Sequence, residues 1–271
     1  IDVCPAGIGL GVHDGCHCPV SSTGATLCLG DAGLVDCGDI GPGDARFGQD
    51  GHYPGQSASF TVNGDGTVTD ELTGLVWSAQ VFLGRDWSAS KTLCETNSQG
   101  LPGQGWRVPG VQEILPIVDY GRASPAWSVE AFGSDCGGGG CSLWTSATAR
   151  SNVDYGVRVS FQTGDAGISP KISTSFIGVR CVRDPAQAAE PEIARLVFLE
   201  EGTRYDRATG LEWGPVNDCV DCTWAQALAT CGGRGAYWRL PSALELGAML
   251  DWSGEDPSCP MWLPGFGASC W

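Results

Sequence analysis

The chain has 271 residues, enough for two or three small domains, and a formal net charge of −16. This charge excludes nucleic acid as an expected partner, because binding it requires Lys and Arg to neutralise phosphates. The same charge repels sulfated glycans and anionic membranes, except where a local basic patch acts within a Debye length of about 8 Å.

Residues 1–57 are rich in Gly and show almost no apolar periodicity. Such a segment buries little core and has to be held by crosslinks, each contributing about 2–4 kcal/mol. Its cysteines are Cys4, Cys16, Cys18, Cys28 and Cys37. A metal corner at Cys16-His17-Cys18 is the alternative, but known zinc spacings are not met, so bridged cysteines are favoured.

The cysteine content predicts the compartment. Fourteen Cys against three His favour disulfides over metal clusters, and cytosolic thiols are kept reduced. Ile1 in place of an initiator Met fits a mature chain or a fragment. No apolar run approaches the roughly 20 residues that cross a bilayer, so we expect a secreted or cell-surface protein without membrane insertion.

A first module is predicted over residues 58–183, beginning with a hairpin. Phe60 and Val62 alternate with polar residues, 63–66 form an Asn-Gly-Asp-Gly turn, and Val68 continues the pattern. The acidic turn could hold calcium, but no Glu follows at the EF-hand offset, so a plain turn is favoured and no cofactor is expected.

Two helices follow the hairpin in the first module. Asp86 can cap a helix over Trp87–Thr96. The second helix is predicted over Gly110–Tyr120, with Pro116 kinking it because proline removes an internal hydrogen bond. Its expected buried stripe consists of Ile114, Leu115 and Val118.

The end of the first module is predicted to be β-structure. Val157, Val159 and Phe161 alternate as a strand, and Phe176–Arg183 reads as the closing strand. Cys136 and Cys141 bracket four glycines, which favours a local bridge. Residues 184–194 are rich in Pro, Ala and Glu and are predicted to be a linker.

Residues 195–271 repeat the signatures of the first module in the same order, so the chain reads as two copies of one unit. Thr73–Trp77 matches Thr209–Trp213, Trp87–Cys94 matches Trp224–Cys231, and Trp106–Pro109 matches Trp238–Pro241. The residues at equivalent repeat positions are Trp77, Trp106, Arg107, Glu113, Trp213, Trp238, Arg239 and Glu245.

The second copy is expected to open with a strand containing Leu196 and Phe198, followed by a turn at Tyr205-Asp206. Ser242 and Glu245 form a capping box that predicts a helix from Ser242 to Trp252, with Leu246 and Leu250 buried. Cys219 and Cys222 form a Cys-x-x-Cys pair. Because no βαβ pattern surrounds it, a local disulfide is favoured over a redox site.

The repeated Arg and Trp residues have two interpretations. Arg107 and Arg239 could be anion ligands, but their constant place before a helix start favours a structural Arg paired with a carboxylate. The eleven Trp could stack on sugars, but most fall at repeat positions, which favours core packing.

Several ordered motifs resemble the DUF1566 family, also called the Lcl C-terminal domain. They are Gly66–Asp70 running into Thr73–Trp77, then Trp106–Pro109, then the closing Gly178–Arg183. The resemblance covers residues 58–183 well and 195–271 partially. It implies an α+β fold of tandem C-type-lectin-like modules with short strands and two helices each, preceded by a disulfide-rich irregular segment. It also implies a long bridge from Cys94 to Cys181, a distant similarity to formylglycine-generating enzymes, and secreted or surface relatives, one a glycan-binding adhesin.

The second copy lacks a counterpart to residues 145–183, which would leave backbone groups and core uncovered. Either the sequence is truncated or a strand from elsewhere fills the gap. The first module has four cysteines, but the second has five: Cys219, Cys222, Cys231, Cys259 and Cys270. Cys231 is the repeat equivalent of Cys94, so we expect Cys231 to bridge to one cysteine of residues 1–57, within one chain or between neighbours.

Three functions compete on this basis. The first is a non-enzymatic secreted structural or adhesive protein that self-associates, as a fibre subunit assembled head to tail. The second is a lectin-like surface protein that binds glycans. The third is an enzyme of the formylglycine-generating type, which needs reactive thiols. We expect no catalytic activity, because the cysteines look paired and no nucleophile-plus-base signature is found.

Overall fold

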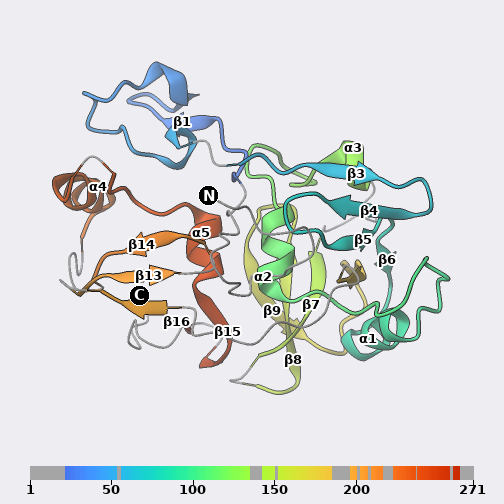
Figure 1. The fold of residues 1–271 in the computed structure, drawn as a ribbon. Helices are drawn as coiled ribbons and strands as arrows, with labels where there is room; N and C mark the ends of the chain where they lie inside the picture. Colours follow the sequence, from blue (N-terminus) through green and yellow to red (C-terminus); the bar gives the residue numbers. More distant parts are fainter. Residues whose placement is uncertain are drawn as a thin grey trace.

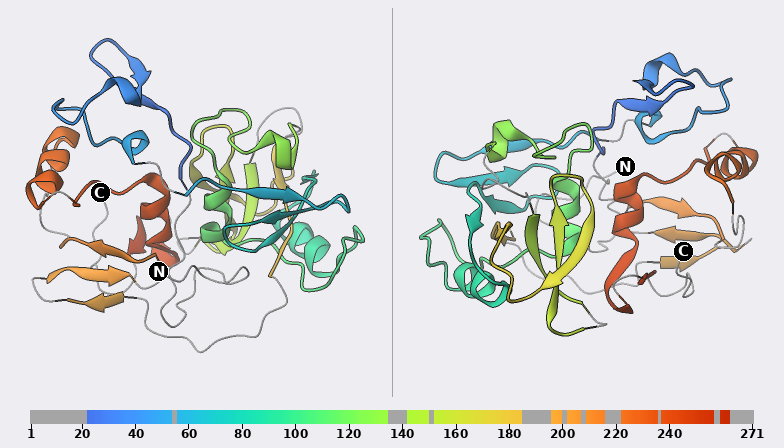
Figure 2. Two further views of the ribbon diagram at one scale, coloured as in Figure 1. Left: turned by 45° about the horizontal axis from the view of Figure 1, so that its top comes forward. Right: turned by 180° about the vertical axis from the view of Figure 1, so that it is seen from behind.

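The computed structural model describes residues 22–53, 56–134, 142–149, 152–184, 196–199, 202–206, 209–215, 222–235, 237–256 and 259–262. The fold is mixed α/β, with several small sheets and few helices (Figure 1). The described part of the first 57 residues forms one body at the edge of the molecule. The two predicted modules lie beside each other (Figure 2).

The N-terminal segment is built on a small hairpin of β1 (Leu27–Leu29) and β2 (Leu34–Asp36), followed by the 3-10 turns η1 (Cys37–Asp39) and η2 (Asp50–His52). A disulfide joins Cys28 to Cys37, and both pack against Ile40 in a core of their own. This confirms that crosslinking holds the segment. The proposed Cys16-His17-Cys18 corner lies outside the described residues.

The first sheet contains β3 (Phe60–Val62), β4 (Thr67–Asp70), β5 (Val76–Ser78) and β11 (Val182–Arg183), in the order β11-β5-β4-β3. The hairpin predicted at its start is confirmed. In the turn, the Asp65 carboxylate accepts hydrogen bonds from the Thr67 N–H (3.1 Å) and hydroxyl (2.6 Å). Nowhere in the described ranges do three His, Cys, Asp or Glu side chains gather as a metal site would require.

The second sheet runs β6-β10-β7-β8-β9. Its strands are β6 (Phe82–Leu83), β7 (Ser142–Thr148), β8 (Tyr155–Ser160), β9 (Ala166–Pro170) and β10 (Ile177–Val179). Only the β10–β7 pair is parallel among these neighbours. The strand predicted at Val157, Val159 and Phe161 is confirmed for the two valines, while Phe161 directly follows the end of β8; all three side chains are buried.

The prediction of one closing strand over Phe176–Arg183 is wrong. The stretch divides into β10 and β11, which belong to different sheets. Between them Arg180 turns its side chain into the core, and Cys181 is bonded to Cys94 of the first helix. The buried Arg180 side chain and the Cys94–Cys181 disulfide fix the path of the chain where it passes from one sheet to the other. The Cys94–Cys181 bridge expected from the family resemblance is confirmed.

The first helix, α1 (Trp87–Glu95), is confirmed with its cap, since the Asp86 carboxylate accepts the Ala89 N–H at 2.7 Å. The second is shorter than predicted: α2 (Val111–Ile114) passes into the 3-10 turn η3 (Leu115–Ile117). Pro116 therefore ends the α-helical geometry instead of kinking a longer helix. A further short helix, α3, spans Val129–Phe132.

The main core lies between the two sheets and the α2–η3 segment. Ile114, Leu115 and Val118 are buried in it as predicted. Trp77 and Trp106 are also buried, which confirms core packing for them, whereas Trp213 and Trp238 are only half-buried. Leu244 of the second module joins this core, so the two modules share one apolar interior.

The second module begins with β12 (Leu196–Phe198), β13 (Arg204–Asp206) and β14 (Leu211–Trp213), a three-stranded antiparallel sheet. The strand predicted at Leu196 and Phe198 is confirmed. The turn predicted at Tyr205-Asp206 is wrong, because both residues pair with neighbours on each side. After β13, the Asp206 carboxylate accepts a hydrogen bond from the Thr209 hydroxyl at 2.8 Å.

The rest of the second module comprises α4 (Trp224–Gly233), α5 (Ala243–Ala248), and the hairpin of β15 (Leu250–Asp256) and β16 (Cys259–Trp262). The predicted helix from Ser242 to Trp252 is too long, because Leu250 and Trp252 belong to β15. Leu246 is half-buried, and the residues of α5 that reach the core are Leu244 and Ala248, followed by Met249. Helix α5 ends here because pairing with β16 takes over from Leu250.

The buried Arg180 gives a direct test of the fold. Lysine at position 180 keeps the positive charge, but its single ammonium group cannot donate to the Ser78 and Phe132 carbonyls as the two terminal nitrogens of arginine do. We expect Arg180→Lys to lower the unfolding free energy by about 2–3 kcal/mol in urea denaturation. The exposed Arg122→Lys should change it by less than about 1 kcal/mol. Equal effects of the two substitutions would contradict a structural role for Arg180.

Candidate functional site

The two repeated arginines form matching ion pairs. Arg107 donates from both terminal nitrogens to the Glu113 carboxylate at 2.7 and 2.6 Å. Arg239 does the same with Glu245 at 2.8 and 2.6 Å. Paired parallel hydrogen bonds of this kind are both strong and geometrically specific. The carboxylate partner predicted for Arg107 and Arg239 is therefore present in both modules.

Local sequence places each pair at the start of a helix. The Glu is the third helical residue in both cases, and its carboxylate also accepts a backbone N–H at the cap: Gly110 at 2.6 Å and Ser242 at 2.7 Å. The Ser242 hydroxyl in turn accepts a hydrogen bond from the Glu245 N–H at 3.1 Å, which completes the predicted capping box. Gly110 has no side chain, so only the glutamate half is made in the first module.

These contacts fix the charge states of the pairs. The hydrogen bonds that Arg107 donates to Glu113 raise the pKa of Arg107 further above its usual value. Burial would raise the pKa of Glu245, but the hydrogen bonds from Arg239 and from Ser242 outweigh it and lower that pKa. The Arg239–Glu245 pair is thus ionised at neutral pH, and in both pairs the guanidinium is engaged by a carboxylate of the same module.

The two braced helices lie against each other. The η3 turn that follows α2 packs on α5, and a Cβ added at Gly247 would come within 2.7 Å of Leu115 Cδ1. The Gln112 side-chain amide donates to the Ala248 carbonyl at 3.4 Å. The repeated helix starts therefore form the junction between the modules.

Each brace also contacts a third segment, and the two differ in this respect. Arg107 bonds Asp184, just beyond β11, at 2.9 Å. The Arg239 guanidinium lies over the ring of Tyr53, 5.0 Å from its centroid. Tyr53 belongs to the N-terminal segment, and a Cβ added at Gly48 of that segment would come within 2.9 Å of Leu228 in α4. The N-terminal segment therefore contacts the second module within one chain.

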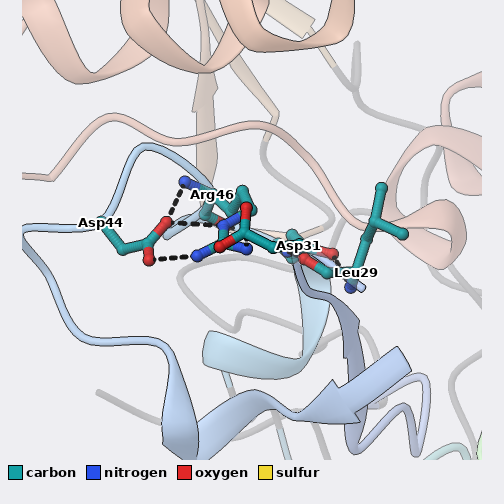
Figure 3. A network of polar contacts seen from close by, with 5 residues as sticks. Leu29, Asp31, Asp44 and Arg46 are labelled. Atoms are coloured by element: carbon teal, nitrogen blue, oxygen red, sulfur yellow. Dashed lines mark hydrogen bonds and ion pairs between the residues drawn. The ribbon is translucent and has the colours of Figure 1, made fainter. Parts of the chain in front are cut away.

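A network of polar contacts stiffens the N-terminal segment (Figure 3). The Arg46 guanidinium lies between Asp44 at 2.5 Å and Asp31 at 2.7 Å. The hydrogen bond from the Arg46 side chain lowers the pKa of Asp44 to about 2. The Gln49 side chain bonds both the N–H of Leu29 (2.7 Å) and its carbonyl (3.1 Å), tying the outer edge of β1 to the loop before η2.

Two cavities flank this framework. One of about 570 Å³ lies beside β3, with Phe60, Asp119, Arg122, Ser128 and Glu130 in its lining. Arg122 bonds Asp119 at 3.0 Å and Glu130 at 3.4 Å at this cavity. The other, about 440 Å³, lies between the N-terminal segment and the second module, where Leu29, Trp224 and Leu240 line it.

The cysteine predictions are tested only in part. Cys28 and Cys37 are bonded to each other, so of the partners predicted for Cys231 only Cys4, Cys16 and Cys18 remain, and all three lie outside the described residues. Cys222 is disulfide-bonded. Cys231 lies on α4 and Cys259 in β16. Cys136, Cys141, Cys219 and Cys270 also lie outside the described part of the chain.

Sequence reasoning missed the roles of Tyr53, Asp184 and Arg180. Tyr53 and Asp184 lie in segments predicted to be irregular, and their contacts join residues far apart in the chain. Arg180 stands inside the closing motif, where an arginine between Val and Cys in an apolar run was the available signal. It is fully buried.

The second brace predicts a pH dependence of stability. Because the folded pKa of Glu245 lies below its ordinary value of 4.5, the pair stabilises the fold fully above pH 4.5, and this stabilisation is lost as pH falls through the folded pKa. We expect Glu245→Gln to cost about 1.5–3 kcal/mol at pH 7, and the cost to shrink as the pH falls below 4.5 through the folded pKa of Glu245. Thermal unfolding of both proteins across this range measures it. Glu95→Gln, which weakens an exposed pair, should cost under about 0.5 kcal/mol throughout.

The contact between the N-terminal segment and α4 can be tested with a matched pair of glycines. Gly48 (φ +105°) and Gly33 (φ +137°) both have a backbone that strains other residues, but only an added Cβ at Gly48 meets Leu228. We expect Gly48→Ala to speed amide hydrogen exchange in α4, whereas Gly33→Ala leaves it unchanged. Similar exchange in both variants would show that α4 does not depend on this contact.

Comparison with known proteins agrees with the sequence motifs over part of the chain. Neither the curated proteins nor the solved structures include a match to it. Residues 66–183 match the family model of the Lcl C-terminal domain, which covers most of the first module.

Proposed function

We propose that this protein is a non-enzymatic extracellular structural or adhesive protein that self-associates. The observation that carries the proposal is the use made of its repeated charged residues. Arg107 and Arg239, the residues best suited to bind an anionic substrate, are held by carboxylates within 2.8 Å and brace the junction between modules. In this proposal the two guanidinium groups stabilise the fold and do not bind a substrate.

We further infer that the second module repeats part of the Lcl-type first module. Asp70 accepts from the Thr73 hydroxyl at 2.7 Å, and Asp206 accepts from Thr209 at 2.8 Å. The strand order β3-β4-β5 recurs as β12-β13-β14, each followed by a capped helix and a braced helix. A relation of either module to C-type lectins stays a prediction from the family resemblance.

An extracellular location is supported by the disulfides. Cys28–Cys37 and Cys94–Cys181 both require an oxidising compartment to persist. Among the described residues no helix combines the length and apolar character that crossing a bilayer requires.

Self-association has a structural route in the contact between the N-terminal segment and the second module. Tyr53 and Gly48 make this contact within one chain. The same contact made with a neighbour would be an exchange of identical elements, a low-cost way to join subunits.

The proposal is tested by the size of the native protein as a function of concentration. We expect light scattering after size exclusion to show a mass that grows with concentration, and electron micrographs to show elongated particles. Non-reducing gels then show whether disulfides join the subunits. A mass equal to one chain of 28.3 kDa at every concentration would contradict self-association. Reactive free thiols in the native protein would instead favour a formylglycine-generating type of enzyme.

Glycan binding is the second candidate, favoured by the cavity of about 570 Å³ beside β3. Its lining combines an aromatic side chain, Phe60, with hydroxyl, carboxylate and guanidinium groups that could orient a sugar. The carboxylates of Asp119 and Glu130 favour neutral over sulfated glycans. A glycan array read with and without calcium separates this candidate from the first.

A further inference from the structure

One face of the N-terminal hairpin is apolar and exposed. Leu29 pairs with Leu34 and Leu27 with Asp36, so these four side chains share a face, which we call the leucine face. The three leucines are 56–70% exposed, while Cys28 and Val35 point the other way into the small core. Large apolar side chains gathered on a rigid, crosslinked hairpin are typical of an interaction surface.

A second exposed apolar surface carries the chain's lysines. The sequence contains only two, Lys91 and Lys171, and both lie over the ring of Trp87, at 5.0 and 4.2 Å from its centroid. The residue after Lys171 is Ile172, 84% exposed. We use the name lysine patch for Lys91, Lys171 and Ile172 together with the exposed Leu83 and Phe176 at the β6–β10 edge of the second sheet.

Phe176 adds an independent sign of function. Its φ of +64° is rare for a bulky residue and costs about 1–3 kcal/mol, yet its side chain is 61% exposed and gains little from packing. It precedes β10, whose Gly178 pairs with Leu83 of β6, so both exposed side chains belong to one edge of the second sheet. A partner that covers the Phe176 side chain would compensate for the cost of its backbone conformation.

The charges of the two surfaces are opposite. Residues 22–53 contain five Asp and one Arg, a net charge of −4 with His neutral, and Asp31 and Asp36 flank the leucines. The lysine patch holds both lysines of a chain whose net charge is −16. Lys91 is paired with Glu95 at 3.9 Å, whereas the Lys171 amine donates to the Thr148 hydroxyl at 2.8 Å and supplies the positive charge of the patch. An acidic apolar surface and a basic apolar surface on the same molecule are complementary.

The two surfaces also lie at opposite ends of the molecule. The β1 hairpin and α1, which carries Lys91 and Trp87, are far apart in Figure 1 and in both views of Figure 2. One chain therefore cannot bring its own two surfaces together, but two copies can. A contact between different surfaces of identical subunits leaves one surface of each kind unused at the two ends, so subunits add until a ring closes or an open chain grows.

We propose that the leucine face of one copy docks on the lysine patch of the next, so that the protein assembles head to tail. This inference rests on the proposed function, since it names the surfaces through which self-association occurs. It differs from exchange of the whole N-terminal segment, because that segment keeps its contact with its own second module.

Two single substitutions at highly exposed positions test the proposal. Leu34→Asp places a charge on the leucine face, and Ile172→Asp places one on the lysine patch. Val153→Asp is the matched control, because Val153 is 70% exposed, like Leu34, and belongs to neither surface. We expect each of the first two variants to weaken self-association at least ten-fold in sedimentation velocity, and the control to behave as wild type. Leu27→Asp is the second variant if Leu34→Asp fails to fold.

Mixing the two defective variants gives the sharper result. Each retains one intact surface, so head-to-tail docking predicts that the mixture forms one-to-one dimers that grow no further, although each variant alone is monomeric. Ile172→Asp assembling like the control would overturn the docking proposal while leaving the proposed function standing. A mixture without dimers would also overturn it, whereas a wild type that never assembles contradicts both.

A membrane is the other partner that a basic apolar patch could fit. Vesicles containing phosphatidylserine provide this arm of the test. Wild-type binding to vesicles that Ile172→Asp abolishes, with no self-association in solution, would assign the patch to lipid and overturn the docking proposal. Absence of vesicle binding together with the dimers described above supports it.

Discussion

A single buried guanidinium holds the two sheets together. Arg180 donates to the carbonyls of Ser78 (2.9 Å), Ala79 and Phe132 (2.9 Å), and its planar group lies against the rings of Trp127 and Phe132, 4.6 and 4.8 Å from their centroids. Burial lowers its pKa to about 9, so it remains charged at neutral pH. Because it stands between β10 and β11, the chain can leave one sheet and enter the other only while these bonds are made. The neighbouring Cys94–Cys181 bridge secures the same crossing covalently.

The junction between the modules depends on the same chemistry in a milder form. The guanidinium groups of Arg107 and Arg239 are half-buried and form ion pairs with carboxylates. Arg180, in contrast, is fully buried and contacts backbone carbonyls and aromatic rings. Each pair aligns the start of a short helix, and the two helices meet through Leu115 and Gly247. Arginine serves throughout as a rigid connector, because its planar fork can satisfy several acceptors at fixed angles. Arg107, Arg180 and Arg239 therefore use their positive charge to hold parts of the fold together.

Local patterns predicted the local structure well. The Asp86 cap and the β3–β4 hairpin follow from spacing within a few residues, where backbone geometry leaves little choice. A carboxylate partner was predicted for Arg107 and Arg239, but its identity as Glu113 and Glu245 comes from the structure. Prediction failed where a distant contact decides the outcome. Phe176–Arg183 reads as one apolar strand, but burial of Arg180 divides it. Leu250 and Trp252 extend a helical pattern, but pairing with β16 makes them a strand. The contact of Tyr53 with Arg239 joins residues 186 positions apart and leaves no signal in the sequence near either.

The position of the two lysines has a practical consequence. Lys91 and Lys171 lie over the same indole, so every side-chain amine of the protein is in one small area. Acylating reagents that couple through these amines would attach the molecule to a bead or a sensor chip in one orientation. The fluorescence of Trp87 would change as the amines react, so the labelling could be followed without a separate dye.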